Sequence, residues 1–179
     1  MPPSRLPIDR HTNLPSINSF GELSEFLRGA VADEDSRQLS EGMGQLASHV
    51  DAIVAALRLN RDRDTLAPLL MDFMTVLRDH RSLVVNLGLA WRGLYEYAGY
   101  LQALNNFRVL IGQWLLHGKA GGGELAVTAE DFELVAWRTL GEGLLLIDMY
   151  EQWLHDENER TSAMGALSEP QVERALQWW

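Results

Sequence analysis

Cysteine is absent from the chain. A disulfide framework, a zinc ribbon, an iron–sulfur site and a cysteine nucleophile are therefore excluded together. Positive charge is also scarce, because fifteen lysine and arginine residues stand against twenty-five aspartate and glutamate residues, for a formal charge of -10. A surface of this charge repels phosphate backbones and anionic lipid surfaces, so we expect no direct binding of nucleic acid.

Long apolar runs are missing as well. No charge-free apolar run reaches the roughly 18 residues that a membrane span needs. Residues 1–18 contain no apolar segment flanked by basic residues, which a secretory signal would require. We therefore expect a soluble protein of the cytoplasm that makes no contact with a membrane.

The motifs of common catalytic and metal sites are also lacking. None of the five histidines stands in a His-x-x-x-His or Glu-x-x-His motif, which would place two metal ligands on one helix face. The glycines of 118–123 lack the Lys-Ser/Thr pair and the preceding strand of a phosphate-binding loop. No Gly-x-Ser-x-Gly motif for a nucleophile occurs. We predict a protein without a metal, a cofactor or enzymatic activity.

What the chain does contain is helical periodicity. Four prolines within residues 1–18 predict a flexible arm, and apolar residues at helical spacing then predict a short helix over 20–31 and a longer one over 36–59, begun by Ser36. Asp64 or Thr65 is expected to cap a third helix. A long helix is predicted from Ser82 to His117, with a possible kink at 105–106. The residue pattern predicts two more helices, one beginning at Thr128 with Asp131 completing its cap, and one after Ser168.

No segment alternates apolar and polar residues in the manner of a strand. With 46% hydrophobic and 22% charged residues, the 179-residue chain has the balance of one globular domain. The sequence therefore predicts an all-α, single-domain bundle of six to seven helices over residues 19–179, with a long central helix.

Aromatic residues are the most informative feature for a site. Gly88 and Gly99 lie about one helical turn from Trp91 or Tyr95, and large rings beside glycines can line a cavity that takes a small apolar ligand. The alternative, a plain hydrophobic core, stays open. The predicted ligand-binding residues are Trp91, Arg92, Tyr95, Arg108, Trp114, His117 and Trp137.

The order of these features resembles a known family. An amphipathic helix over 36–59 precedes a second helix that ends in residues 77–84, with His80 before a new apolar run. A long helix, a turn containing Gly123-Glu124-Leu125, an acidic helix start over 128–131 and closing helices follow. From about residue 35 onward, the chain is similar to the regulatory domain of TetR-type transcriptional repressors.

This resemblance implies a homodimer that forms through the last two helices and encloses a small, often apolar effector. The residues that it places in the dimer contact are Leu144, Ile147, Tyr150, Leu154, Val172 and Leu176. The family's basic DNA-binding module is not found within residues 1–34, which are rich in proline and end in acidic residues. We therefore expect a non-enzymatic regulatory domain that acts through a protein partner.

An alternative function rests on charge alone. The acidic clusters Asp33 to Asp35 and Asp156, Glu157 and Glu159 are suited to cover a basic surface, since complementary charge speeds association and selects partners. On this hypothesis the chain is a helical inhibitor, an immunity protein, an antitoxin or a chaperone that blocks a basic protein partner.

Overall fold

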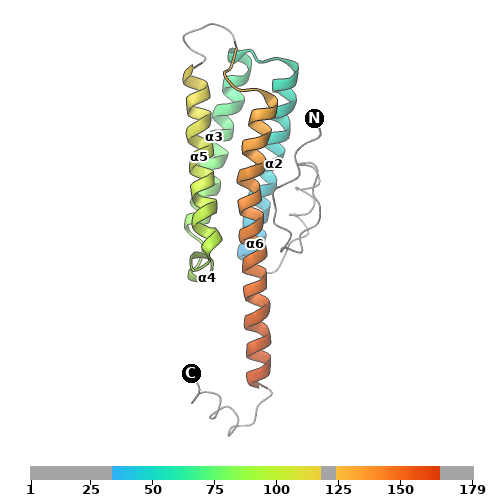
Figure 1. Ribbon diagram of the computed structural model, residues 1–179, viewed down its shortest axis with the longest axis vertical. Coiled ribbons are helices and arrows are strands. Elements are labelled where there is room, and N and C mark those ends of the chain that lie inside the picture. Colours follow the sequence, from blue (N-terminus) through green and yellow to red (C-terminus); the bar gives the residue numbers. More distant parts are fainter. Residues whose placement is uncertain (1–33, 118–123, 166–179) are drawn as a thin grey trace.

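The computed structural model describes residues 34–117 and 124–165, and side chains as far as residue 163. These residues form five helices (Figure 1). They are α2 (Glu34–Leu59), α3 (Arg63–Val85), α4 (Leu89–Arg92), α5 (Tyr95–His117) and α6 (Ala129–Gly165). Within the described ranges there is no strand, only an isolated bridge between Asp62 and Glu124, which confirms the all-α prediction. The expected arm, the helix over 20–31, the loop over 118–123 and the helix after Ser168 lie outside these ranges.

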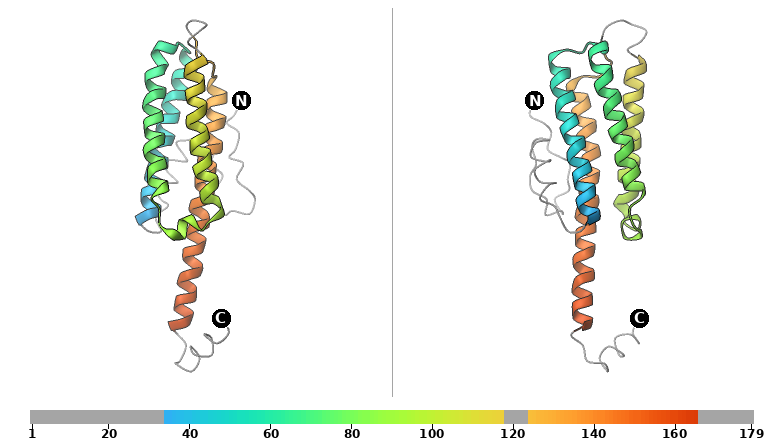
Figure 2. Two further views of the ribbon diagram at one scale, coloured as in Figure 1. Left: turned by 90° about the vertical axis from the view of Figure 1, so that its left-hand side faces the viewer. Right: turned by 180° about the vertical axis from the view of Figure 1, so that it is seen from behind.

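Four long helices run alternately up and down and form a bundle (Figure 1). Helix α2 contacts α3 and α6, and α5 also contacts α3 and α6, so each long helix has two neighbours. We call the side formed by α2 and α6 one layer and the opposite side, formed by α3 and α5, the other (Figure 1). The side and rear views show the same arrangement (Figure 2). The 37 residues of α6 make it about 55 Å long, against about 34 Å for the 23 residues of α5. Helix α6 therefore projects beyond the bundle, and no described helix is apolar enough over sufficient length to cross a membrane.

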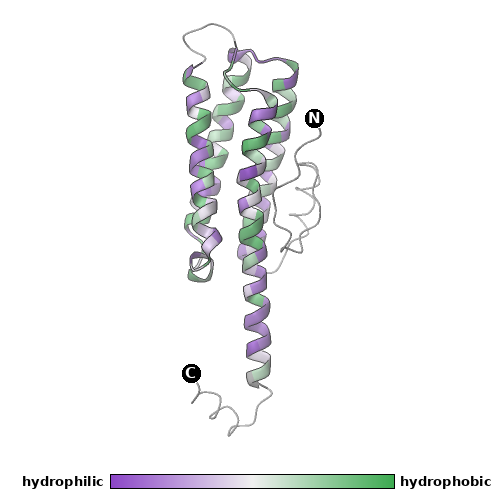
Figure 3. Cartoon of the chain, viewed as in Figure 1, coloured by the Kyte–Doolittle hydropathy of each residue, from purple (hydrophilic) through white to green (hydrophobic). Residues whose placement is uncertain are grey.

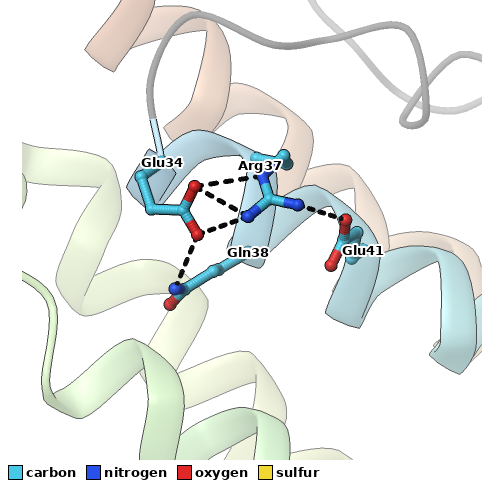
Figure 4. A network of polar contacts seen from close by, with 4 residues as sticks. All are labelled: Glu34, Arg37, Gln38 and Glu41. Atoms are coloured by element: carbon cyan, nitrogen blue, oxygen red, sulfur yellow. Dashed lines mark hydrogen bonds and ion pairs between the residues drawn. The ribbon is translucent and has the colours of Figure 1, made fainter.

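Helix α2 follows the predicted apolar stripe. Its buried residues recur at spacings of three and four, so one face of the helix enters the core. The helix begins two residues before the expected Ser36, which is itself buried. In the first turns, Arg37 pairs with Glu34 and Glu41, and the Gln38 amide donates to Glu34 (Figure 4). These groups are exposed, so the pairs contribute little to stability.

The cap of α3 differs from the expectation of Asp64 or Thr65, which is wrong. The N-cap is Asp62, whose carboxylate accepts a hydrogen bond of 3.2 Å from the backbone N–H of Thr65 and one of 2.9 Å from its hydroxyl. The charged run over 60–63 obscured this boundary, because Asp62 and Asp64 are equally good caps by residue type.

We expect Asp62→Ala to lower the free energy of unfolding by about 1 kcal/mol, because it removes this cap. Asp64→Ala should cost no more than about 0.5 kcal/mol, since Asp64 only complements the helix dipole in the first turn. Urea denaturation of both variants checks the assignment, and a larger loss in Asp64→Ala would contradict it.

The predicted continuous helix from Ser82 is wrong. Helix α3 ends at Val85, α4 forms a single turn, and α5 starts at Tyr95, whereas the expected kink at 105–106 lies inside unbroken helix. The Arg92 guanidinium donates to the carbonyls of Leu87 and Val85, at 3.0 and 2.9 Å, and so satisfies groups near the end of α3. Leu87 and Trp91 are buried in this corner, so the apolar stripe of the sequence continues through it. The spacing of apolar residues therefore gives no sign that the helix ends here.

The start of α6 agrees with the expectation. The backbone N–H of Asp131 donates to the Thr128 hydroxyl at 3.2 Å, and that of Phe132 to the Thr128 carbonyl at 3.0 Å. Just before this point, the N–H of Leu125 donates to the carbonyl of Arg61 at 2.9 Å. This bond ties the α2–α3 connection to the segment that leads into α6.

Three phenylalanine rings join the helices in the middle of the core. Phe73 on α3, Phe107 on α5 and Phe132 on α6 lie with ring centroids 5.3 to 5.8 Å apart. All three are almost inaccessible to solvent. The two contacts of Phe107 are edge-to-face, and such contacts contribute beyond the burial of their surface.

Candidate functional site

The structure does not bring the predicted ligand-binding residues together. Trp91 lies on α4 at one end of the bundle, whereas Trp114 and His117 lie in the last turns of α5 at the opposite end (Figure 1). Trp137 is buried in α6, and Tyr95 is 92% exposed. An enclosed pocket lined by these rings is therefore not formed.

The two arginines among the predicted ligand-binding residues do not line a pocket either. Arg92 holds the α3–α4 corner through the two hydrogen bonds described above. Arg108 is exposed on α5. Surface hollows lie elsewhere. One of about 490 Å³ follows α2 from Ser40 to His49, and one of about 320 Å³ follows α6 from Asp148 to Asp156.

A stack of aromatic rings fixes α6 at the point where it leaves the bundle. The rings of Trp91 and Tyr150 lie 3.6 Å apart with an interplanar angle of 16°, and Tyr150 and Trp153 follow at 5.9 Å and 20°. Trp91 is buried, whereas Trp153 is 38% exposed. The stack thus leads from the core to the surface.

Most of the predicted dimer residues pack against other helices of the same chain. Leu144, Ile147 and Tyr150 belong to the hydrophobic core, with at most 5% of their surface exposed. Leu154 packs against that core. Val172 and Leu176 lie outside the described residues. The described face of α6 that carries these residues is therefore occupied by the chain's own helices.

A buried polar pair crosses the core near the same end. Nε2 of His80 on α3 and the hydroxyl of Tyr100 on α5 lie 2.6 Å apart, and their residues are 5% and 0% exposed. Burial lowers the pKa of His80 to about 4 and raises the pKa of Tyr100 above its usual range. Both groups are therefore neutral near pH 7.

Two glycines make room for this pair. A β-carbon on Gly42 of α2 would overlap Nδ1 of His80 and lie 2.9 Å from its Cε1. A β-carbon on Gly143 of α6 would lie 2.8 Å from Cζ of Tyr100 and 2.7 Å from Cε of Met43. All four long helices thus contribute residues to one cross-section of the core, which contains the His80–Tyr100 pair.

The His80–Tyr100 pair and the residues around it serve packing rather than acid–base catalysis. General acid–base catalysis needs a group that can reach a substrate and titrate near the working pH, and His80 does neither. The lowered pKa of His80 comes from burial, and no carboxylate offsets it. Sequence reasoning missed the pair, since the two residues are twenty positions apart and belong to different helices. Only the unexplained Gly42 and Gly143 within apolar helices could have pointed to it.

The exposed part of α6 carries an acidic face. We use this name for six residues on one side of the helix, at spacings of three and one: Asp148, Glu151, Gln152, His155, Asp156 and Glu159. The last three are exposed, and the hydropathy colouring shows that the projecting part of α6 is hydrophilic (Figure 3). Partial burial raises the pKa of Asp148, which also accepts a 3.0 Å hydrogen bond from Gln152.

Charge is divided unevenly between the two layers. Helix α6 carries nine acidic residues and two arginines, and α2 carries four and two, which gives this layer a net charge of -9. Helix α3 carries three of each sign and α5 one of each, so their layer is neutral. The acidic character of the chain is therefore a property of one side of the bundle.

Metal binding has no candidate among the described residues, because no three His, Asp or Glu side chains come close enough to share an ion. Comparison of the chain with protein-family models, with curated proteins and with solved structures finds no match. The candidate site therefore rests on the geometry of the acidic face and its surroundings.

Proposed function

We propose that the protein is a non-enzymatic helical binding protein whose acidic face on α6 covers a basic surface of a protein partner. The observation that carries the proposal is the arrangement of carboxylates on this face. Asp148, Glu151, Asp156 and Glu159 follow one side of α6 from the bundle onto its projecting part, and no lysine or arginine interrupts them.

The surroundings of the acidic face favour such a contact. The aromatic stack holds the base of the projection in place, so the carboxylates are presented on a helix of fixed direction. Complementary charge increases the rate of association and selects between partners more than it increases affinity. The first turn of α2, with Glu34 and Asp35, lies near the level at which α6 leaves the bundle and adds to the same negative region (Figure 1).

A small-molecule sensor of the TetR type has less support. Trp91 is stacked on Tyr150, Trp137 is enclosed in the core, and Tyr95 points into solvent, so these residues do not share a cavity. The relation to that family, and a ligand for it, stay predictions.

The proposal can be tested with a fluorescent octa-arginine peptide as the probe. We expect the double variant Glu151→Lys, Asp156→Lys to bind at least about tenfold more weakly, a loss of about 1.4 kcal/mol, in fluorescence anisotropy near physiological salt. The matched control is Asp72→Lys, Asp79→Lys on α3, which makes the same change in net charge at exposed positions.

The control should change the affinity less than about twofold, because its charges lie on the neutral layer. Equal weakening by both double variants would show that only net charge matters and would refute the proposed site.

A further inference from the structure

The outward side of α5 carries an uncharged stripe along its whole length, flanked by the exposed Arg108. Seven residues alternate at spacings of three and four and lie opposite the buried face of the helix. We call them the α5 stripe: Tyr95, Ala98, Gln102, Asn105, Val109, Gly112 and Leu116. Six of the seven are exposed, with Tyr95 at 92%, Leu116 at 71% and Val109 at 50%.

Gly112 is not explained by packing within the chain. A β-carbon at this position would meet no atom within 4 Å. Glycine is less favourable than alanine inside a helix, so a position with open space around it gains nothing from glycine within the chain. Gly44 on α2 is equally open. Gly112 differs in lying within the α5 stripe, where the close approach of a second backbone would favour glycine.

The α5 stripe is complementary to itself when reversed. In an antiparallel pair of α5 helices with a two-fold axis near Asn105, Tyr95 of one copy lies opposite Leu116 of the other. Ala98 then lies opposite Gly112, and Gln102 opposite Val109. Large residues meet at the two ends, small residues allow close approach between them, and the amides of Asn105 meet at the axis, where paired polar groups fix register.

We propose that the chain forms a two-fold homodimer through the α5 stripe, with the two α5 helices antiparallel. Charge supports a second copy on this side, because the layer of α3 and α5 is neutral whereas that of α2 and α6 has a net charge of -9. Two copies joined here keep their acidic layers on opposite outer sides. This arrangement does not depend on the proposed function of the acidic face.

The α5 stripe is one helix wide, about 10 Å, and about 34 Å long, so it covers roughly 340 Å² on each copy. Standard interfaces bury about 800 Å² per partner, so a dimer of standard size also uses the adjoining side of α3. The proposed contact uses described residues that are exposed in the monomer, in contrast to Leu144, Ile147 and Tyr150, which the core already encloses.

The first test is the mass of the full chain by sedimentation at about 10 and 100 μM. We expect a dimer, and we expect Leu116→Glu to weaken it at least about tenfold, because the variant places a charge in an apolar contact. Leu59→Glu is the matched control, since Leu59 is 89% exposed and lies on α2. Adding Tyr95→Lys to Leu116→Glu should restore the dimer, because the new lysine faces the new glutamate only in the antiparallel register.

Cross-linking gives a second readout that requires no loss of stability. The chain has no cysteine, so Asn105→Cys introduces a single thiol beside the axis and should yield a covalent dimer on oxidation. Arg138→Cys, exposed on α6, should not. A monomer at 100 μM, equal effects of Leu116→Glu and Leu59→Glu, or failure of the lysine to restore the dimer would overturn the proposal.

Discussion

Replacing Gly42 with alanine is expected to lower the free energy of unfolding by about 2–3 kcal/mol, because overpacking of a filled core costs this much. The new β-carbon would overlap the ring of His80, and that ring cannot simply turn away, since its other nitrogen is held 2.6 Å from the Tyr100 hydroxyl. In a chain of this size, the melting temperature should fall by roughly 5–10 °C.

Gly44 offers a matched control two residues further along α2. A β-carbon there would meet nothing within 4 Å, so Gly44→Ala should raise stability by about 0.5–1 kcal/mol through helix propensity alone. Urea denaturation and thermal melting of both variants decide the matter. A neutral or stabilising Gly42→Ala would show that the core around His80 is less tightly packed than described.

Acid should destabilise the fold through His80. The pKa of His80 is lowered to about 4 in the folded protein, from an ordinary value of 6.5, because the ring is buried. As the pH falls below about 6.5, His80 is protonated in the unfolded chain but stays neutral in the folded chain. The free energy of unfolding therefore decreases until about pH 4, where His80 is protonated in the folded chain as well, and then levels off. A shift of this size corresponds to about 3 kcal/mol in total.

The contribution of His80 can be isolated with His80→Gln, which carries no charge at any pH. Wild type should exceed the variant in stability at about pH 7.5, and this difference should shrink by about 2–3 kcal/mol by about pH 4.5. Asp51 and Asp148 act in the opposite direction, because burial raises the pKa of each carboxyl. Both proteins share these groups, so they cancel in the comparison. A difference that does not change with pH would contradict the buried, neutral state of His80.

The periodic part of the fold could be predicted from sequence. Apolar residues at spacings of three and four placed α2 within two residues of its start, and Thr128 with Asp131 placed the start of α6. These signals are local, because a cap or a stripe lies within a few turns of one helix.

The corner between α3 and α5 could not be predicted in the same way. Leu87 and Trp91 continue the apolar stripe through the turn, since both are buried at the end of the bundle. Glycine is compatible with either a helix interior or a corner, so Gly88 and Gly93 did not distinguish the two structures. The expected kink at 105–106 failed because asparagine disfavours a helix only weakly.

The site was harder to predict because it depends on which helices become neighbours. Trp91 and Trp114 share an apolar stripe in the sequence but lie at opposite ends of the bundle. His80 meets Tyr100 only because α3 and α5 are adjacent. The acidic residues after Asp148 were visible, but the neutrality of the opposite layer appears only when the charges are assigned to helices in space.

The uneven division of charge also bears on how the protein behaves at physiological ionic strength. There the Debye length is about 8 Å, which is no greater than the distance of about 8–10 Å between packed helix axes. The outer sides of the two layers lie farther apart than their helix axes, so ions in the surrounding solution screen much of the field of the acidic layer at the outer side of the neutral one. A formal charge of -10 would suggest colloidal repulsion between molecules in every orientation, yet molecules that meet by their α5 sides experience little of it. For this chain, the isoelectric point is a poor guide to self-association, and the orientation of the encounter is a better one.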